Sequence, residues 1–340
     1  GAERHLLYPA RASDGALRAM LHFDPIDARL LDEFQRDLPL VARPYAAIGV
    51  HLGISERQVI ARLTRLIAEG KVARVGATVR PNTAGASTLA ALAVPADRLE
   101  EVAALVGAEP GVNHSYQRED SWNLWFVATA SGTAPLTACL GRIEAATGLP
   151  VLDLRLERAF NIDLGFRLKG VRQAMAADRP AEPLALSDRD RVLLHGLAQG
   201  LPLVPHPFAA LGEEEAVLDR IAALCRARII TRLGVIVRHR ALGYTSNAMV
   251  VWDLPEHRID AAGQALAALP GVTLCYRRKT VPGVWPYALY SMIHGTSRAA
   301  ALEVLEAARA LPDLAGAMSK PLFSLRCFKQ TGAHIVEAAP

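Results

Sequence analysis

The 340-residue chain has only four cysteines, and none of them forms a C-x-x-C motif. Cys139, Cys225, Cys275 and Cys327 lie far apart in the chain. This spacing excludes a disulfide-stapled fold and gives no support to a thiolate zinc site or an iron–sulfur cluster. Few and scattered cysteines are typical of proteins from a reducing compartment, so we expect a cytoplasmic protein.

Long apolar runs are also absent. No stretch approaches the roughly 18 to 20 apolar residues that are needed to span a bilayer. Residues 1–21 carry acids and arginines along their length and lack the apolar centre of a signal peptide, so we expect an N-terminal extension. The sequence therefore predicts no membrane association.

Three common cofactor and metal motifs are missing. The chain has no G-x-G-x-x-G after a predicted strand, no G-x-x-x-x-G-K-[ST] and no H-E-x-x-H. Dinucleotide, nucleoside triphosphate and zincin-type chemistry therefore have no support. We expect neither a separate cofactor nor a metal that the protein itself holds.

A large excess of one charge is lacking as well. The chain has 38 basic and 34 acidic residues, a net charge of +4 and a pI near 9.0. A strong duplex binder would carry more basic residues, whereas a compact polyanionic ligand suits this balance. With 51% apolar and only 21% charged residues, the chain has enough apolar material for at least two packed domains.

The chain repeats itself with a period of about 160 residues. Four segments of the first half recur in the second half in the same order: Leu38–Tyr45 as Leu201–Phe208, Arg74–Arg80 as Arg232–Arg238, Pro110–Val112 as Pro270–Val272, and Tyr116 and Arg118 as Tyr276 and Arg278. Because the order is kept, the pattern predicts a tandem duplication. About five residues are lost in the second half between the first two of these segments.

Each half is predicted to contain a winged helix-turn-helix. In the first half, helices over 25–38, 44–52 and 55–69 precede the segment 72–79, which we expect to form a pair of strands. Ser55 followed by Gln58 predicts a capping box at the start of the third helix.

A βαββαβ pattern follows in each half. In the first half it runs through 87–94, 97–107, 112–118, 123–130, 135–147 and 149–158, and in the second through 245–254, 257–269, 272–278, 287–294, 298–311 and 316–328. This order predicts a ferredoxin-like sandwich, in which one antiparallel sheet carries two helices on one face.

The predicted fold class is therefore α+β, a tandem duplication of a winged helix-turn-helix and a ferredoxin-like sandwich. The expected domains are an extension (1–21), a winged helix-turn-helix (22–82), a ferredoxin-like domain (83–173), a linker (174–187), a degenerate winged helix-turn-helix (188–240) and a second ferredoxin-like domain (241–333).

This arrangement resembles the Lrp/AsnC transcription regulators, which raises the question of DNA binding. Arg57, Arg62 and Arg65 lie on the helix over 55–69 and would meet phosphates, although such residues are also typical of a solvated helix face. In the second half, Gly212–Glu215 replaces the corresponding turn, and its three adjacent carboxylates would repel a phosphate backbone. A two-fold operator needs two competent readers, so we expect no specific DNA binding.

Aromatic and basic side chains concentrate in one hairpin of each half, over 114–126 and 275–287. Three of the four tryptophans lie there: Trp122, Trp125 and Trp285. Both hairpins join the second and third strands of a predicted sandwich.

The residues of these hairpins share a face of their strand. His114, Tyr116 and Arg118 project from one side, as Tyr276 and Arg278 do in the other half. Each of them alone is typical of a half-buried strand residue or an exposed sheet edge. As a repeated set they favour an anion-binding face, because arginine forks bind carboxylates and aromatic faces cover apolar rings.

Four motifs resemble a known enzyme family. They are HSYQREDSWNLWF (114–126), VRHRALGY (237–244), CYRR…VWPYALYSMIHG (275–295), and LPLV…PF. Over residues 22–333 they resemble the siroheme decarboxylases, in the form that joins two subunit types in one chain. The family pattern has an asparagine after WPY, where this chain has Ala288.

The resemblance implies a reaction. Two ring acetates of siroheme would each lose their carboxylate as carbon dioxide, which gives didecarboxysiroheme, on the route to haem d1 or haem b. Siroheme carries eight carboxylates around an iron-containing macrocycle, so a pocket for it needs several arginines. No separate cofactor is implied, since the iron belongs to the substrate.

The resemblance and the residue types together predict the site. His114, Tyr116 and His239 are the candidate catalytic residues, because the methylene carbon that loses carbon dioxide must be protonated by a nearby acid. His114 or His239 is also the candidate axial ligand of the siroheme iron, and the two roles are not assigned separately. The candidate substrate-binding residues are Arg80, Arg118, Asn123, Trp125, Arg238, Tyr276, Arg277, Arg278, Trp285 and His294.

The expected partners are siroheme and didecarboxysiroheme, without specific DNA or a membrane. A homodimer and association with related decarboxylase subunits stay open, because two sandwiches in one chain can form a pseudo-dimer internally. The alternative functions are an Lrp/AsnC-type ligand-responsive regulator and a siroheme carrier without turnover.

Overall fold

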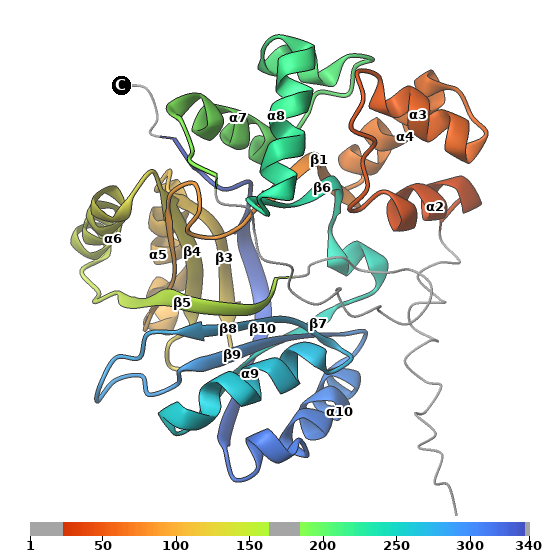
Figure 1. The fold of residues 1–340 in the computed structure, drawn as a ribbon. Coiled ribbons are helices and arrows are strands. Elements are labelled where there is room, and N and C mark those ends of the chain that lie inside the picture. The colour runs from red at the N-terminus through yellow and green to blue at the C-terminus, as the bar shows by residue number, and fades with distance from the viewer. Residues whose placement is uncertain (1–22, 163–183, 337–340) are drawn as a thin grey trace, which may run out of the picture.

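The computed structural model describes residues 23–162 and 184–336 (Figure 1). The predicted extension over 1–21 and most of the predicted linker over 174–187 lie outside these described residues. Within them, no helix is both long and apolar enough to cross a membrane.

Eight strands close into one antiparallel barrel (Figure 1). The first half supplies β2 (Ala86–Leu92), β3 (Val112–Arg118), β4 (Leu124–Ala130) and β5 (Leu152–Ile162), and the second half supplies β7 (Ser246–Asp253), β8 (Val272–Arg278), β9 (Leu289–Gly295) and β10 (Met318–Gln330). Within each half the strand order, β5-β2-β4-β3 and β10-β7-β9-β8, is that of a ferredoxin-like sheet. The predicted α+β fold class is confirmed.

The two sheets are continuous through their edge strands. β5 pairs with β8, which places Ala159 beside Tyr276, and β10 pairs with β3, which places Cys327 beside Tyr116. The sequence predicts one sheet per half but not this junction. An edge strand exposes unpaired backbone N–H and C=O groups, and pairing with the other half satisfies them.

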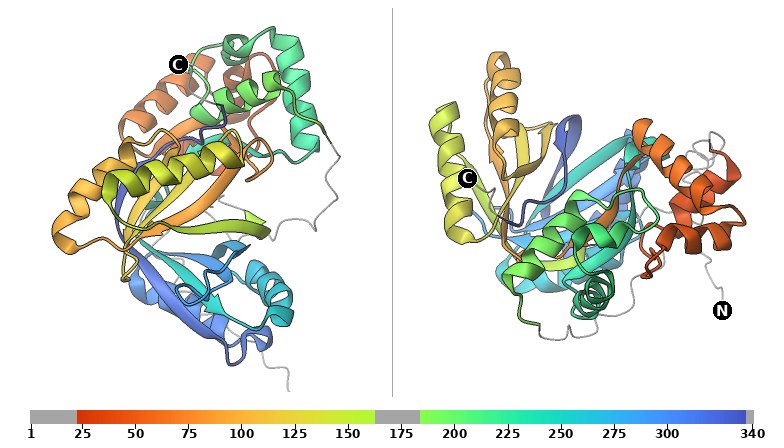
Figure 2. Two further views of the ribbon diagram at one scale, coloured as in Figure 1. Left: turned by 90° about the vertical axis from the view of Figure 1, so that its left-hand side faces the viewer. Right: turned by 90° about the horizontal axis from the view of Figure 1, so that it is seen from above.

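Helices cover the outside of the barrel (Figure 2). The first sheet carries α5 (Leu99–Ala108) and α6 (Thr133–Thr147), and the second carries α9 (Ile259–Ala268) and α10 (Arg298–Arg309). The 3-10 turns η1 (Ala96–Arg98) and η4 (Glu256–Arg258) lead into α5 and α9, and η5 (Pro312–Leu314) precedes β10. Each helix pair buries an apolar core against its sheet, and a further apolar cluster around Trp125, Tyr290 and Leu322 fills part of the barrel interior.

The winged-helix elements gather at one end of the barrel (Figure 1). They are α2 (Pro25–Glu33), α3 (Pro44–Leu52), α4 (Glu56–Ala68) and β1 (Val72–Val79) in the first half, and α7 (Asp188–Gln199), η2 (Pro207–Leu211), α8 (Glu214–Arg226), β6 (Ile230–Val237) and η3 (His239–Leu242) in the second. The predicted capping box of Ser55 and Gln58 is present. The counterpart of α3 is only the 3-10 turn η2, in the region where the second half is shorter.

The prediction that 72–79 forms a pair of strands is wrong. The segment is the single strand β1, and its partner is β6 of the other half, with Gly76 opposite Gly234. Local patterning cannot show this, because the residues that complete the pair lie in the other half of the chain.

The two winged-helix units interlock at these glycines. The backbone N–H of Val235 donates to Phe34 O at 2.7 Å, and that of Leu201 donates to Val75 O at 2.7 Å. A Cβ on Gly76 would lie 2.4 Å from Leu197 O, and a Cβ on Gly234 would lie 2.4 Å from the backbone of Gln35. Only glycine lets the chain beyond each first helix approach the other half's strand so closely.

We predict that Gly76→Ala and Gly234→Ala each lower the free energy of unfolding by about 1–3 kcal/mol, because the added methyl group displaces packed backbone. Urea denaturation followed by circular dichroism measures this as a lower midpoint. Gly107→Ala in α5 is the matched control, since its Cβ meets nothing within 4 Å. A Gly234→Ala midpoint equal to that of Gly107→Ala would contradict the prediction.

Candidate functional site

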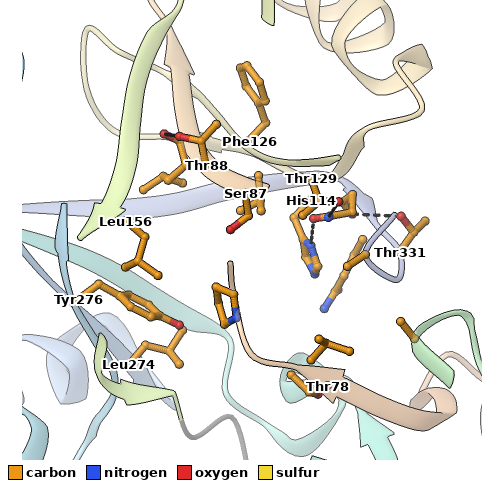
Figure 3. A pocket seen from close by; sticks show the side chains of 18 of the residues that line it. Thr78, Ser87, Thr88, His114, Phe126, Thr129, Leu156, Leu274, Tyr276 and Thr331 are labelled. Atoms are coloured by element: carbon orange, nitrogen blue, oxygen red, sulfur yellow. Dashed lines mark hydrogen bonds between the residues drawn. The ribbon is translucent and has the colours of Figure 1, made fainter. Parts of the chain in front are cut away.

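A cavity of about 390 Å³ lies between the barrel interior and the β1–β6 sheet (Figure 3). All eight barrel strands contribute to its lining, β10 only with its second part. The strands β1 and β6 and the segment over 330–335 complete it. Figure 3 shows Ser87, His114 and Tyr276 directed towards a common space from three different strands. Because both halves line it, neither half encloses the cavity alone.

Two arginines related by the internal repeat lie on its barrel side, Arg118 buried and Arg278 half-buried. Arg118 on β3 donates from Nη1 to Leu322 O at 3.1 Å, and Arg278 on β8 donates from Nη1 to Leu154 O at 3.1 Å. Each guanidinium is therefore bound to a strand of the other half. The Nε atom of both arginines has no hydrogen-bond partner within the described residues.

Burial weakens the preference of these two groups for the charged form but does not abolish it. It lowers the pKa of Arg118 to about 10 and also lowers the pKa of Arg278. Arginine side chains stay protonated in proteins, so both are cationic at neutral pH. Neither has a carboxylate partner among the described residues. A buried cation without a carboxylate is costly for the fold, and an anionic ligand would offset this cost.

Tyrosines lie beside these arginines. The guanidinium carbon of Arg118 is 5.6 Å from the Tyr116 ring centroid, and that of Arg278 is 5.1 Å from Tyr276 and 5.8 Å from Tyr290. Burial raises the pKa of Tyr276 to about 12 and raises that of Tyr116 as well. Both phenols therefore keep their proton at neutral pH and can donate it in a hydrogen bond.

Three further arginines line the cavity: Arg74 on β1, Arg80 directly after β1, and Arg232 on β6. Burial lowers the pKa of Arg74, whose Nε has no hydrogen-bond partner within the described residues. Of the three, only Arg80 is among the predicted substrate-binding residues. The repeated motif 74–80 and 232–238 begins with Arg74 and Arg232, so the signal that points to them is present in the sequence.

The described residues that line the cavity include no aspartate, glutamate or lysine. All its formal charge comes from arginines, whose planar forks bind carboxylates through two parallel hydrogen bonds. The lining also contains apolar side chains, among them Phe126, Met249 and Met292. The cavity therefore suits a ligand that has an apolar body and several carboxylates.

The three predicted histidines line the same cavity. Burial, together with the nearby charge of Arg74, lowers the pKa of His114 to about 4. Burial, together with Arg240, lowers the pKa of His239 to about 4. Both imidazoles are therefore neutral at pH 7, a form that can act as a base or bind a metal.

His239 and His294 lie against each other. Their ring centroids are 4.8 Å apart, with an angle of 69° between the planes. Asn247 Nδ2 donates to His239 Nε2 at 2.7 Å. The segment after β10 adds His334, which lines the cavity and is not among the predicted site residues.

Most of the predicted site residues come together here. The structure places His114, Tyr116, His239, Arg80, Arg118, Trp125, Tyr276, Arg278 and His294 on the cavity wall. These residues lie on both halves and on strands that are distant in sequence.

Four predicted substrate-binding residues are not on that wall. The Asn123 amide bonds to the backbone of Val94 through both Oδ1 (2.9 Å) and Nδ2 (2.8 Å), which ties β4 to the end of β2. Arg238 is exposed. Arg277 pairs with Glu157 at 2.8 Å and with Glu256 at 2.5 Å.

Trp285, the fourth, is buried behind the cavity. Its Nε1 donates to the Tyr290 hydroxyl at 2.8 Å, and its ring centroid is 5.3 Å from that of Trp125. Because Trp125 and Tyr290 do line the cavity, Trp285 supports its wall from the second layer.

Family comparisons agree with this organisation. Residues 84–161 and 241–329 match the AsnC-like ligand binding domain, and residues 27–72 match the siroheme decarboxylase NirDL-like HTH domain. The two AsnC-like matches fall on the two halves of the barrel.

One curated relative covers the chain almost completely, and another covers a little less than half of it. The chain is 64% identical over 321 residues to the siroheme decarboxylase NirDL subunit of Paracoccus denitrificans, covering 93% of this chain and 99% of that protein. It is 50% identical over 148 residues to the siroheme decarboxylase NirD subunit of Stutzerimonas stutzeri, covering 44% of this chain and 97% of that subunit.

A solved structure extends the similarity to three dimensions. The crystal structure of the siroheme decarboxylase NirDL in complex with an iron-uroporphyrin III analogue superposes with a TM-score of 0.61 at 25% identity, covering 91% of this chain and 92% of that one. Sequence, domain matches and fold thus agree over both halves, and the chain belongs to the siroheme decarboxylase family of enzymes.

Proposed function

We propose that this enzyme is a carbon–carbon lyase that removes the carboxylates of two ring acetates of siroheme as carbon dioxide and forms didecarboxysiroheme. The observation that carries the proposal is the shared cavity, which holds the buried cation Arg118 and the half-buried cation Arg278 and has no acidic side chain among its described lining residues. Siroheme brings its own iron, so the reaction needs no separate cofactor.

Each decarboxylation breaks the bond between the carboxylate carbon and the methylene carbon of an acetate. Carbon dioxide leaves, the electron pair stays on the methylene carbon and delocalises into the macrocycle, and a proton then converts the methylene to a methyl group. The protein must therefore hold the macrocycle, keep water from the reacting acetate, and provide a proton at the methylene carbon.

The cavity residues suit these tasks. The arginines bind the carboxylates that do not react, and the apolar lining with the β1–β6 sheet above it limits the access of water. His114, Tyr116 and His239 are the candidate catalytic residues because they are half-buried polar groups on the wall of the same cavity. His114 or His239 is also the candidate ligand of the substrate iron.

The alternative of a DNA-binding regulator has less support. Arg62 donates to Asp24 at 2.9 Å and to Asp27 at 2.7 Å, and Arg65 pairs with Asp27 and Glu69. These contacts within the winged helix reduce the positive charge that α4 offers to a phosphate backbone. In the second half, Glu213 caps α8, which then begins with two more glutamates.

Anaerobic incubation with siroheme tests the reaction itself. We predict a product that is lighter by two carbon dioxide units, measured by mass spectrometry of the extracted macrocycle. Siroheme that binds and is recovered unchanged would contradict the proposal and identify the chain as a carrier.

Substitution of the candidate catalytic residues tests their roles. We predict that His114→Ala, Tyr116→Phe and His239→Ala each reduce kcat on the order of 10²-fold, the usual contribution of a positioned acid or base. Steady-state decarboxylation rates of correctly folded variants measure this. A loss below about threefold would assign the residue to structure.

Two adjacent arginines provide a matched comparison for binding. Arg278→Met removes a cavity cation, and we predict that it weakens siroheme binding about tenfold or more, since a hydrogen bond to a charged group contributes about 1.5–3 kcal/mol. Arg277→Met removes only ion pairs outside the cavity and should leave the Kd nearly unchanged. Absorbance titration with siroheme measures both, and equal losses would show that the cavity is not the binding site.

A further inference from the structure

β3 and β8 carry the same irregularity at the cavity edge. The register with the neighbouring strand shifts between Val112 and His114 in β3, and between Val272 and Leu274 in β8. The residues within the shifts, Asn113 and Thr273, are both buried and polar. A bulge of this kind turns a side chain out of the regular alternation of the strand.

In the first half this side chain contacts His114. Asn113 Oδ1 lies 2.7 Å from His114 Nδ1, and Asn113 Nδ2 donates to Thr129 Oγ1 at 3.1 Å. Thr129 Oγ1 also accepts the backbone N–H of His334 at 3.0 Å. The threonine oxygen therefore acts as the acceptor that fixes which way the amide faces.

The orientation of this amide decides where the imidazole carries its proton. An amide carbonyl oxygen can only accept a hydrogen bond, so Nδ1 of His114 must be the donor. A neutral imidazole has a single N–H, and its other nitrogen, Nε2, then carries a lone pair. The His114 ring points from β3 into the cavity (Figure 3).

The second half makes a parallel contact with a hydroxyl. Thr273 Oγ1 donates to Met292 O at 3.2 Å and lies 2.8 Å from His294 Nδ1. The hydroxyl has one hydrogen; when it donates this hydrogen to the carbonyl, Oγ1 accepts from Nδ1–H. Both bulge residues therefore hold a cavity imidazole by the same ring nitrogen.

From these contacts we propose that Asn113 and Thr129 are positioning residues that hold His114 with its proton on Nδ1 and the Nε2 lone pair towards the cavity. Such a partner on the second ring nitrogen is the usual way in which proteins set the tautomer of a histidine. For catalysis, the inference rests on the proposed function, because it assumes that His114 takes part in the reaction.

The consequence is a division of roles. A neutral imidazole with a lone pair on Nε2 accepts a proton or binds the iron of the substrate, and it does not donate a proton from that nitrogen. The proton for the methylene carbon then comes from another group, and Tyr116 and His239 are the candidates that remain.

Nuclear magnetic resonance of the substrate-free protein tests the tautomer directly. In protein labelled with ¹⁵N in the histidine rings, long-range proton–nitrogen correlations distinguish protonated from unprotonated ring nitrogens. The signals that disappear in His114→Gln belong to His114. We expect a protonated Nδ1 and an unprotonated Nε2, and the opposite pattern would overturn the proposal.

Thr129→Val and Thr129→Ser test the positioning role. The valine removes the acceptor that orients Asn113, so we expect a mixture of tautomers at His114 and a kcat lower by about tenfold. The serine keeps the hydroxyl and should restore both. Thr147→Val, which removes a buried hydroxyl bonded to Ile143 O in α6, is the control and should behave as wild type.

Two results would overturn the positioning role: an unchanged tautomer in Thr129→Val, or a changed tautomer with unchanged kcat. The spectra need no substrate, so the two hypotheses can fail separately. A wild-type chain that shows Nδ1–H but releases no carbon dioxide from siroheme would sustain the tautomer and contradict only the proposed function.

Discussion

Strand pairing between the two halves is the constraint on which the rest of this structure depends. Two ferredoxin-like sheets have four edges, and the pairs β5–β8 and β10–β3 remove all of them by closing the barrel. The strands of the two winged-helix units, β1 and β6, also pair across the two halves. Closure brings Arg118 and Arg278, one from each half, into a single interior, so the cavity is a product of pairing rather than of either domain.

The same pairing explains how the fold tolerates buried positive charge. Arg118 and Arg278 each donate to a backbone carbonyl on a strand of the opposite half, which satisfies one N–H but leaves the charge unneutralised. Replacing the carbonyl by a carboxylate would neutralise the cation and remove the affinity for an external anion. The fold therefore keeps these arginines ordered and still available, which is the arrangement that a substrate with many carboxylates requires.

The sequence predicts the elements of this protein better than their partners. The bounds of β3 and β8 were predicted as observed, because a Pro-Gly-Val turn precedes each strand and a hairpin follows it. The partner of β1 was not, since it lies in the other half. For the site, the hairpin motif led to both Arg277 and Arg278, but only the barrel shows that Arg278 faces inward while Arg277 pairs with glutamates outside. Arg74 and Arg232 are not among the predicted site residues, because β1 and β6 form a wall of the cavity only when they pair across the two halves.

The internal two-fold pseudo-symmetry is broken in the cavity lining, where equivalent positions of the two halves carry different residues. By the repeat that aligns Tyr116 with Tyr276, His114 corresponds to Leu274, and both residues line the cavity. In a symmetric homodimer any substitution in a shared central cavity appears twice, once from each copy. A tandem chain frees each half to mutate alone, so a histidine can face a leucine across the axis. The two orientations in which a flat, unsymmetrical macrocycle can enter the cavity therefore meet different side chains.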